Sequence, residues 1–333
     1  MTEALYGPDG FYRRENPAAH FRTSVHSSPL FAVALATLAE GVDAALGHPD
    51  RFDLVDVGAG RGELLSAVTE AVPDGLRRRL HAVAVEVAAR PPGLDPAVDW
   101  TDQVPPVTGL LLANEWLDNV PVDVVELTAD GPRVLLVEPT GEESFGPSAS
   151  AADRAWLDRW WPLTEIGSRA EVGRSRDDAW AGSLGRLRRG AALAIDYMHD
   201  RPRRASGGYP VGTLTGFRAG RQVPPVPDGL CDLTAHVALD SCAHAGRSAG
   251  ALDTLLTTQR AALRALGVRG QRPPHSLASA APAEYVAALS RAGHAAELTN
   301  PTGMGGFGWL LQTMGISTRT ALPGVPELGC RAT

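Results

Sequence analysis

The chain has 333 residues, of which 44% are apolar and 21% are charged. This is typical of a globular enzyme with one core and a large insertion, or with two domains. The net charge is −7 and no basic tail is present, so a general binder of nucleic-acid phosphates is not expected. All 31 lysine-or-arginine positions are arginine, which excludes a lysine Schiff base or amine nucleophile.

Cysteine usage and the N-terminus favour a cytoplasmic protein. Cys231, Cys242 and Cys330 form no CxxC pair, and their odd number argues against a disulfide framework or a zinc site. The N-terminus lacks the basic and apolar regions of a signal peptide, and no apolar run approaches the ~18 residues of a membrane span. The sequence therefore predicts a cytoplasmic protein that binds no metal, membrane or nucleic acid.

The N-terminal segment, residues 1–50, is expected to cover a ligand pocket. Residues 6–29 are irregular and aromatic-rich, and Ser28 and Pro29 suit the N-cap and first turn of a helix that reaches about Leu46. Because this segment precedes the first strand of the expected sheet, we expect it to fold over the pocket as a lid.

A buried strand, a glycine-rich turn and a helix start follow one another at Leu54–Glu63. The apolar run suits a strand covered on both faces. A ligand can approach the turn closely, because glycine has no Cβ and accepts positive φ. The turn consists of Gly58, Ala59, Gly60, Arg61 and Gly62. The free N–H groups of the helix start face the ligand, so the sequence predicts a nucleotide-type pocket at the carboxyl end of a parallel strand.

Alternating strands and helices predict an α/β fold with a doubly wound, Rossmann-like parallel sheet. Strands are expected at 53–57, 81–86, 98–100, 109–114, 122–127, 134–137, 190–197 and 305–312, and helices at 62–72, 151–162, 234–245, 250–266 and 282–293. The expected divisions after the N-terminal segment are a core at 51–140, a helical insertion at 141–190, a third part at 191–317 and a disordered tail at 318–333. The third part is expected to hold the rest of the sheet, a long functional loop at 200–230 and a helical subdomain.

Two carboxylates narrow the ligand of the glycine turn. Asp56 lies inside the first strand, where dinucleotide folds usually carry an apolar residue, and it can accept from an amine or hold a water. Glu86 ends the next strand, where a carboxylate can accept from ribose hydroxyls, although a solvated strand end is an alternative. Arg61 is the one basic residue of the turn and is expected to point outward, so a diphosphate has no partner. A nucleoside without phosphates fits, and S-adenosylmethionine is one.

The ends of the third and fourth strands carry further candidates. Asp102 suits either the adenine amino group or a turn. Asn114 and Glu115 end the fourth strand, at the edge where doubly wound sheets bind ligands. They are candidates for positioning an attacking amine or the sulfonium end of the cofactor. Asp118 and Asn119 could belong to the same site or could equally be turn or capping residues.

The order of these motifs resembles that of the MidA-like class I methyltransferases, which include the mitochondrial complex I assembly methyltransferase. The most specific segment, Ala113-Asn-Glu-Trp-Leu-Asp-Asn-Val-Pro-Val122, is similar to the family's Ala-Asn-Glu-Phe-Phe-Asp-Ala-Leu-Pro-Val. The other matching segments are Phe21–Ser24 with Ser28–Phe31, Leu54–Leu64, Ile195–Tyr197, Gly212–Leu214, Asp232–Val237, Thr258–Gln259 with Leu266–Gly267, and Met304–Gly305. The resemblance covers nearly the whole chain.

The chain departs from the family pattern at four places. The family's N-terminal Pro-Glu is here Val25-His26, the Glu of the first strand is Asp56, a proline between the glycines is Ala59, and Phe-Lys near the C-terminus is Phe307-Gly308. The change at His26 bears most on the substrate site. It leaves open a different substrate or weakened catalysis.

The resemblance implies methyl transfer from S-adenosylmethionine, with S-adenosylhomocysteine as product. The cofactor residues expected are Thr23, Ser24, Asp56, Gly58, Ala59, Gly60, Gly62, Glu86, Asp102 and Asn114. A protein arginine is the first acceptor expected, because the eukaryotic relative acts on one. Glu115 is the candidate partner of the guanidinium, with Asn114 positioning it. The acceptor-side residues expected are His26, Asp118, Asp196 and Tyr197, and His236 is either a general base or a helix cap.

Two alternatives to a protein arginine methyltransferase stay open. A small-molecule O- or N-methyltransferase of secondary metabolism would use the same pocket, with residues 200–230 choosing the acceptor. A non-catalytic assembly factor would keep the fold and bind a partner. An NAD-dependent oxidoreductase is disfavoured because the diphosphate site is missing. The sequence does not fix the oligomeric state, and a homodimer stays open.

Overall fold

The structure is a computed structural model that describes residues 1–14 and 28–328. The chain folds into two compact units, each made from segments that are far apart in sequence. Unit 1 comprises residues 1–21, 115–185 and 196–250, and unit 2 comprises residues 22–114, 186–195 and 251–333.

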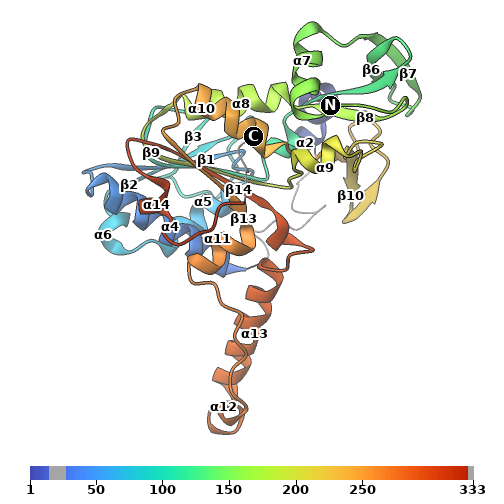
Figure 1. Cartoon of the computed structure of the whole chain (residues 1–333). Helices are drawn as coiled ribbons and strands as arrows, with labels where there is room; N and C mark the ends of the chain where they lie inside the picture. Colours follow the sequence, from blue (N-terminus) through green and yellow to red (C-terminus); the bar gives the residue numbers. More distant parts are fainter. Residues whose placement is uncertain (15–27, 329–333) are drawn as a thin grey trace. The chain divides into compact units, whose positions relative to one another are not determined.

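Unit 2 is built around a seven-stranded sheet with the strand order β13-β14-β9-β4-β1-β2-β3 (Figure 1). The strands are β1 (Phe52–Val57), β2 (Leu80–Val85), β3 (Asp99–Thr101), β4 (Val107–Asn114), β9 (Leu187–Asp196, whose last residue falls in unit 1), β13 (Asp253–Thr258) and β14 (Gly308–Met314). Five strands, from β3 to β9, pair in parallel, whereas β13 is antiparallel to β14. The predicted α/β, doubly wound sheet is confirmed. Strand order reverses between β1 and β4, which is where such sheets bind ligands.

Close approach of the central strands explains two of their glycines. A Cβ on Gly109 would lie 2.2 Å from the backbone oxygen of Asp53, and a Cβ on Gly190 would lie 2.0 Å from that of Gly109. Both glycines also have positive φ, of 148° and 126°. Only glycine fits at either position, so these residues fix how β1, β4 and β9 come together.

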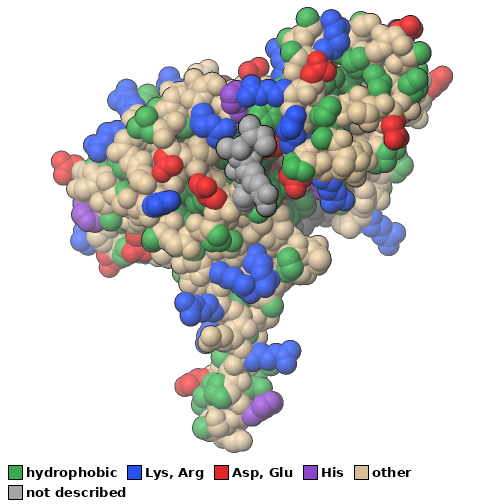
Figure 2. Space-filling model, viewed as in Figure 1, with side chains coloured by type: hydrophobic (Ala, Val, Ile, Leu, Met, Phe, Trp, Pro, Cys, Tyr) green, Lys and Arg blue, Asp and Glu red, His purple; other side chains and the backbone are tan. Residues whose placement is uncertain are grey.

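The helices of unit 2 flank this sheet or project from it. They are α4 (Pro29–Leu46), α5 (Glu63–Ala71), α6 (Asp74–Arg77), α11 (Gln259–Ala265), α12 (His275–Ala280), α13 (Pro282–Leu298), the 3-10 turn η3 (Met304–Gly306) and α14 (Thr318–Ala321). Figure 1 shows α12 and α13 extending away from the sheet as a helical hairpin. None of the described residues of α12 is buried, and Figure 2 shows apolar and charged side chains mixed on this hairpin.

The helix α4 begins and ends as predicted, with the Ser28 hydroxyl accepting from the N–H of Leu30 at 3.1 Å. We expected no apolar run as long as a membrane span, and this is wrong. In length and composition α4 could span a membrane, because it has 18 residues and a mean hydropathy of 1.5. Half of α4 is nevertheless buried in unit 2, and its Asp43 is ion-paired with Arg79 at 2.7 Å. This is the pattern of a core helix.

Two further expectations for unit 2 are wrong. The first half of the helix expected at 250–266 is β13, because Leu255 and Leu256 pair with Leu311 and Leu310 of β14. The tail expected to be disordered from 318 begins instead with α14, where the hydroxyl of Thr318 donates to Oδ2 of Asp253 at 2.8 Å. Residues 329–333 lie outside the described part of the chain.

Unit 1 contains two antiparallel sheets, one of four strands (β7-β6-β5-β8) and one of three (β11-β10-β12). Its elements are α1 (Thr2–Tyr6), α2 (Phe11–Arg14), η2 (Leu117–Asn119), β5 (Asp123–Thr128), β6 (Gly131–Val137), β7 (Glu143–Ser148), α7 (Ala151–Trp160), β8 (Arg169–Val172), α8 (Arg174–Leu184), α9 (Arg201–Ala205), β10 (Thr215–Arg218), β11 (Arg221–Val223), β12 (Asp232–Thr234) and α10 (Leu239–Ser248). The strands expected near 122–127 and 134–137 therefore exist but do not join the parallel sheet. The insertion expected to be helical at 141–190 supplies β7 and β8 as well as two helices.

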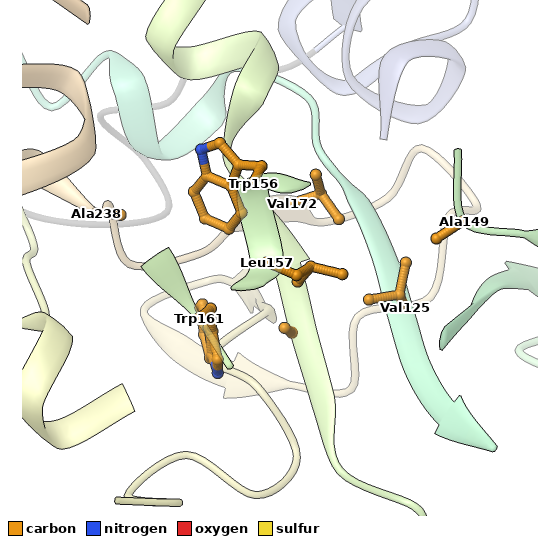
Figure 3. Packing of buried hydrophobic residues seen from close by; sticks show 8 residues of the cluster. Val125, Ala149, Trp156, Leu157, Trp161, Val172 and Ala238 are labelled. Carbon is orange, nitrogen blue, oxygen red and sulfur yellow. The ribbon is translucent and has the colours of Figure 1, made fainter. Parts of the chain in front are cut away.

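A tryptophan-rich core holds the four-stranded sheet of unit 1 to α7. Figure 3 shows Trp156, Leu157 and Trp161 gathered against Val125 and Val172 of the sheet. All five side chains are buried. Burying side chains of this size contributes roughly 1.5–3 kcal/mol each, so Trp156 and Trp161 are core residues of unit 1.

Candidate active site

The glycine turn of unit 2 has the backbone that its sequence requires. All six residues of β1 are buried, and Gly58, Gly60 and Gly62 follow with φ of 71°, 58° and 82°. A Cβ on Gly60 would have only a carboxylate oxygen of Glu63 within 4 Å, at 3.9 Å. The surface above Gly60 is therefore open, and α5 begins directly after it at Glu63. An open backbone turn at the start of a helix suits a bound ligand.

The carboxylate of Glu86 lies across this turn. Its Oε2 accepts from the N–H of Gly60 at 3.0 Å, and its Oε1 accepts from the N–H groups of Val87 and Ala88 at 2.7 and 3.1 Å. A carboxylate offers about four lone-pair sites, so one site remains after these three bonds within the described part of the chain. Glu86 can therefore hold one ribose hydroxyl without losing a backbone contact, and a second hydroxyl would replace one.

Asp56 lies in β1 behind the turn and is 2% exposed. Burial, and then the charges of Glu86 and Glu63, raise the pKa of Asp56 to about 8. In the free protein this carboxyl group is therefore mostly protonated at neutral pH. A positively charged ligand group close to it would favour the ionised form.

The remaining candidates of unit 2 are more exposed. Asp102 is exposed, just after β3. Asn114 is partly exposed at the end of β4, where its Cα partner in β9 is Ile195. Thr23, Ser24 and His26, with the lid that they were expected to form, lie outside the described residues.

Glu115 opens the segment that returns the chain to unit 1. It is partly exposed and has a left-handed backbone conformation with φ of 49°. Only two other described non-glycine residues, His48 and Ala219, have positive φ. Such a conformation costs of order 1 kcal/mol in a non-glycine residue and is often found at functional sites.

Asp196 holds the turn that follows Glu115. Its Oδ2 accepts from the N–H groups of Leu117 and Asp118 at 3.0 and 3.2 Å, and its Oδ1 accepts from the N–H of Tyr197 at 3.0 Å. The side chain is fully buried. Burial and the nearby carboxyl group of Asp118 raise the pKa of Asp196 well above its usual value. Asp196, predicted on the acceptor side, therefore fixes the backbone and presents no surface to solvent.

Asp118 is buried in the same turn. Its Oδ2 accepts from the hydroxyl of Thr234 at 2.7 Å, and burial raises its pKa. Its Oδ1 is buried without a hydrogen-bond partner among residues 1–14 and 28–328. The turn alternative for Asp118 and Asn119 fits their place in η2.

A buried arginine and a buried aspartate complete this network, and sequence reasoning missed both. Arg176, 2% exposed, donates to the backbone carbonyls of Asp118, Val120, Ala235 and His236. Asp232 accepts from the hydroxyl of Tyr12 at 2.9 Å and from the amide of Asn119 at 3.1 Å. Burial, and then Asp118, raise the pKa of Asp232 to about 7.

The predicted residues Tyr197 and His236 lie together in unit 1, with their rings stacked at a centroid distance of 5.8 Å. Burial, and then the charge of Glu115, raise the pKa of Tyr197, whereas burial, and then Arg176, lower the pKa of His236. His236 is therefore a neutral imidazole at neutral pH. The helix-cap alternative for His236 is wrong, because the N-cap of α10 is Ala238.

Comparisons with known proteins agree with this geometry. The family model described as "Putative S-adenosyl-L-methionine-dependent methyltransferase" matches residues 34–258. A crystal structure of a COG1565 superfamily member from Burkholderia thailandensis, bound to S-adenosyl-homocysteine, is 27% identical with a TM-score of 0.78, over 98% of this chain and 89% of that chain. A native structure of a COG1565 superfamily protein from the same organism is 27% identical with a TM-score of 0.77, over the same shares. No curated protein matches the chain.

The parallel sheet, the open glycine turn and Glu86 define an S-adenosylmethionine-dependent methyltransferase of the class I type. The chain belongs to the COG1565-type family of these enzymes, which confirms the family suggested by the motifs. The cofactor supplies the methyl group and becomes S-adenosylhomocysteine. The residues present fit it, because Gly60 leaves the backbone open, Glu86 keeps one acceptor site among the described residues, and the buried carboxyl group of Asp56 would ionise beside a cationic group.

Substituting Gly60 by alanine is expected to weaken S-adenosylmethionine binding more than it weakens the fold. The new Cβ would occupy the open face of the turn, and the φ of 58° adds strain of about 1 kcal/mol. Gly93→Ala is a matched control, because Gly93 also has positive φ (87°) with nothing within 4 Å of a Cβ. Calorimetric titration should show weaker cofactor binding in Gly60→Ala but not in Gly93→Ala. Both variants should lose a similar amount of melting temperature. Equal affinities in the two variants would contradict an open ligand site at Gly60.

Cofactor binding is expected to strengthen as pH rises towards about 8, the pKa of Asp56 in the free protein. The sulfonium and amino groups of the cofactor are cationic, so they favour the ionised carboxylate, and binding then releases a proton. Affinity should rise through neutral pH and level off above the pKa. Titration in two buffers of different ionisation enthalpy measures the released proton. Asp56→Asn should remove the proton release, and a pH-independent affinity in the unmodified protein would refute the coupling.

Proposed function

We propose that the methyl acceptor is a guanidinium nitrogen of a protein arginine side chain. The observation that carries the proposal is the carboxylate of Glu115, which is partly exposed and follows directly on β4. A guanidinium pairs with a carboxylate through charge-assisted hydrogen bonds. Glu115 would hold the guanidinium, and Asn114 before it would position the pair.

Rigid placement of Glu115 supports this role. Asp196 binds the N–H groups two and three residues after Glu115, and Arg176 binds two carbonyls of the same turn. Methyl transfer needs the nucleophile in line with the S–CH3 bond, so most of the catalysis is positioning. A carboxylate on a fixed turn restrains the acceptor nitrogen better than one on a mobile loop, and the proton leaves that nitrogen after the transfer.

Incubation with methyl-labelled S-adenosylmethionine tests the proposal. The purified full-length protein is added to a cell lysate freed of small molecules, and protein bands are examined for label. A labelled band is expected. Label that appears only when the small molecules are restored would instead support a small-molecule O- or N-methyltransferase, and cofactor binding without any transfer would support a non-catalytic assembly factor.

A further inference from the structure

Unit 1 contains a small, partly enclosed cavity with two histidines in its wall. The cavity has a volume of about 10 Å3. Its wall consists of Trp156, Trp161, Glu171, Gly173, Arg176, His199, His236, Ala238 and Cys242. Figure 3 shows Trp156, Trp161 and Ala238 around this part of the tryptophan-rich core. A volume of roughly this size is the smallest that holds a water molecule.

Both histidines bring a buried nitrogen without a protein partner. The Nε2 of His199 and the Nδ1 of His236 are each buried and have no hydrogen-bond partner among the described residues. His199 itself is 4% exposed. Two orphaned polar atoms beside one cavity are unusual, because more than about 90% of buried polar groups in proteins are hydrogen-bonded, often to an internal water.

The tautomer of His199 is fixed by its other nitrogen. The Nη1 of Arg204 lies 2.9 Å from Nδ1 of His199, and a guanidinium can only donate. Arg204 is held in place by Asp240, which accepts from its Nη2 through both oxygens at 2.8 and 2.7 Å. Nδ1 of His199 must therefore be the acceptor, and burial, with Arg204 close by, lowers the pKa of His199 well below its usual value. The neutral ring then carries its proton on Nε2, which is an N–H donor.

We propose that this cavity is a binding site for one ordered water molecule, held between Nε2–H of His199 and Nδ1 of His236. The ring centroids are 6.2 Å apart, a separation that one bridging water can span. The site joins the chain leaving β9 to the chain leaving β12, which already pair at Met198 and Val237. The water thereby holds His236 in its stacked orientation on Tyr197. The importance of that orientation for the methyl acceptor rests on the proposed function, whereas the water site does not.

Two substitutions at His199 test the water site. The test is which of the two variants is more stable against denaturant. Glutamine can place an amide N–H near the position of Nε2, whereas methionine of similar length cannot; both lose the Nδ1 acceptor. With a water in the cavity, His199→Gln should unfold at a higher denaturant concentration than His199→Met. In a dry cavity the order reverses, because glutamine would bury an unpaired amide.

The same pair at His244 is the control. His244 also faces an arginine through its Nδ1, at 3.4 Å from Nη2 of Arg159, but it is partly exposed and does not line the cavity. Its glutamine and methionine variants should unfold at closely similar denaturant concentrations. A His199→Met variant as stable as His199→Gln, or more stable, would overturn the proposal whatever the methyl acceptor is.

Two direct observations complete the test on the unmodified protein. A high-resolution crystal structure should show one water within hydrogen-bond distance of both nitrogens. Nitrogen-15 NMR should find His199 as the neutral Nε2–H tautomer. A cavity without water density, or a His199 proton on Nδ1, would each contradict the assignment.

Discussion

Replacing Glu86 by glutamine is expected to weaken S-adenosylmethionine binding about 10- to 100-fold while the protein stays folded. A hydrogen bond to a charged group contributes roughly 1.5–3 kcal/mol, and Glu86 has one acceptor site left for a ribose hydroxyl after its three backbone contacts. Glutamine keeps one oxygen for the backbone but lacks the charge and the second oxygen. Calorimetric titration measures the affinity, and thermal unfolding reports the fold.

Glu63→Gln is the matched control for this experiment. Glu63 lies on the same turn, where its Oε2 accepts from the N–H of Arg61 at 3.1 Å, and it also contributes to the raised pKa of Asp56. It does not end a strand of the sheet, and its neutralisation removes one cause of the raised pKa of Asp56, so this variant should not bind the cofactor more weakly. An affinity for the cofactor that is the same in the Glu86 and Glu63 variants would show that Glu86 does not contact the ribose.

Replacing Glu115 by glutamine is expected to lower methyl transfer on the order of 100-fold or more without changing cofactor affinity. The substitution removes a charge-assisted contact to the acceptor, and the loss of one well-placed polar group at a reaction centre costs roughly 3–4 kcal/mol. Label transfer measures the rate, and titration with S-adenosylmethionine confirms that unit 2 is intact. Glu142→Gln, a neutralisation on the exposed turn between β6 and β7, should leave both values unchanged.

Glu115→Gly distinguishes the effect of the left-handed backbone conformation at this position from the effect of the carboxylate charge. Glycine accepts the φ of 49° without strain, so this variant should match or exceed the melting temperature of the unmodified protein and still lose transfer activity. An active Glu115→Gly variant would mean that the carboxylate has no part in the reaction.

The cofactor half of the site was predictable because its signals are local. The strand, the turn and the start of α5 occupy consecutive residues, and the φ values of Gly58, Gly60 and Gly62 follow from the residue type. The place of Glu86 follows from the parallel register, in which Val57 pairs with Val85. The sequence did not show that Glu86 is already engaged by three backbone N–H groups.

The network behind Glu115 was not predictable because its contacts are distant in sequence. Asp196 binds N–H groups 79 and 78 residues away, and Tyr12 reaches Asp232 across 220 residues. A carboxylate at a strand end gives the same local pattern whether it meets a ligand or a backbone turn. The error at β13 has a similar origin, since its register depends on β14, fifty or more residues later.

The chemical form of the transferred label tests the central claim most directly. Labelled protein from the lysate incubation is hydrolysed in acid, and the amino acids are separated beside standards. We expect the label in methylated arginine and expect Glu115→Gln to abolish it. Label that is released by mild base as methanol, which indicates a carboxyl methyl ester, or label in any amino acid other than arginine would contradict the claim.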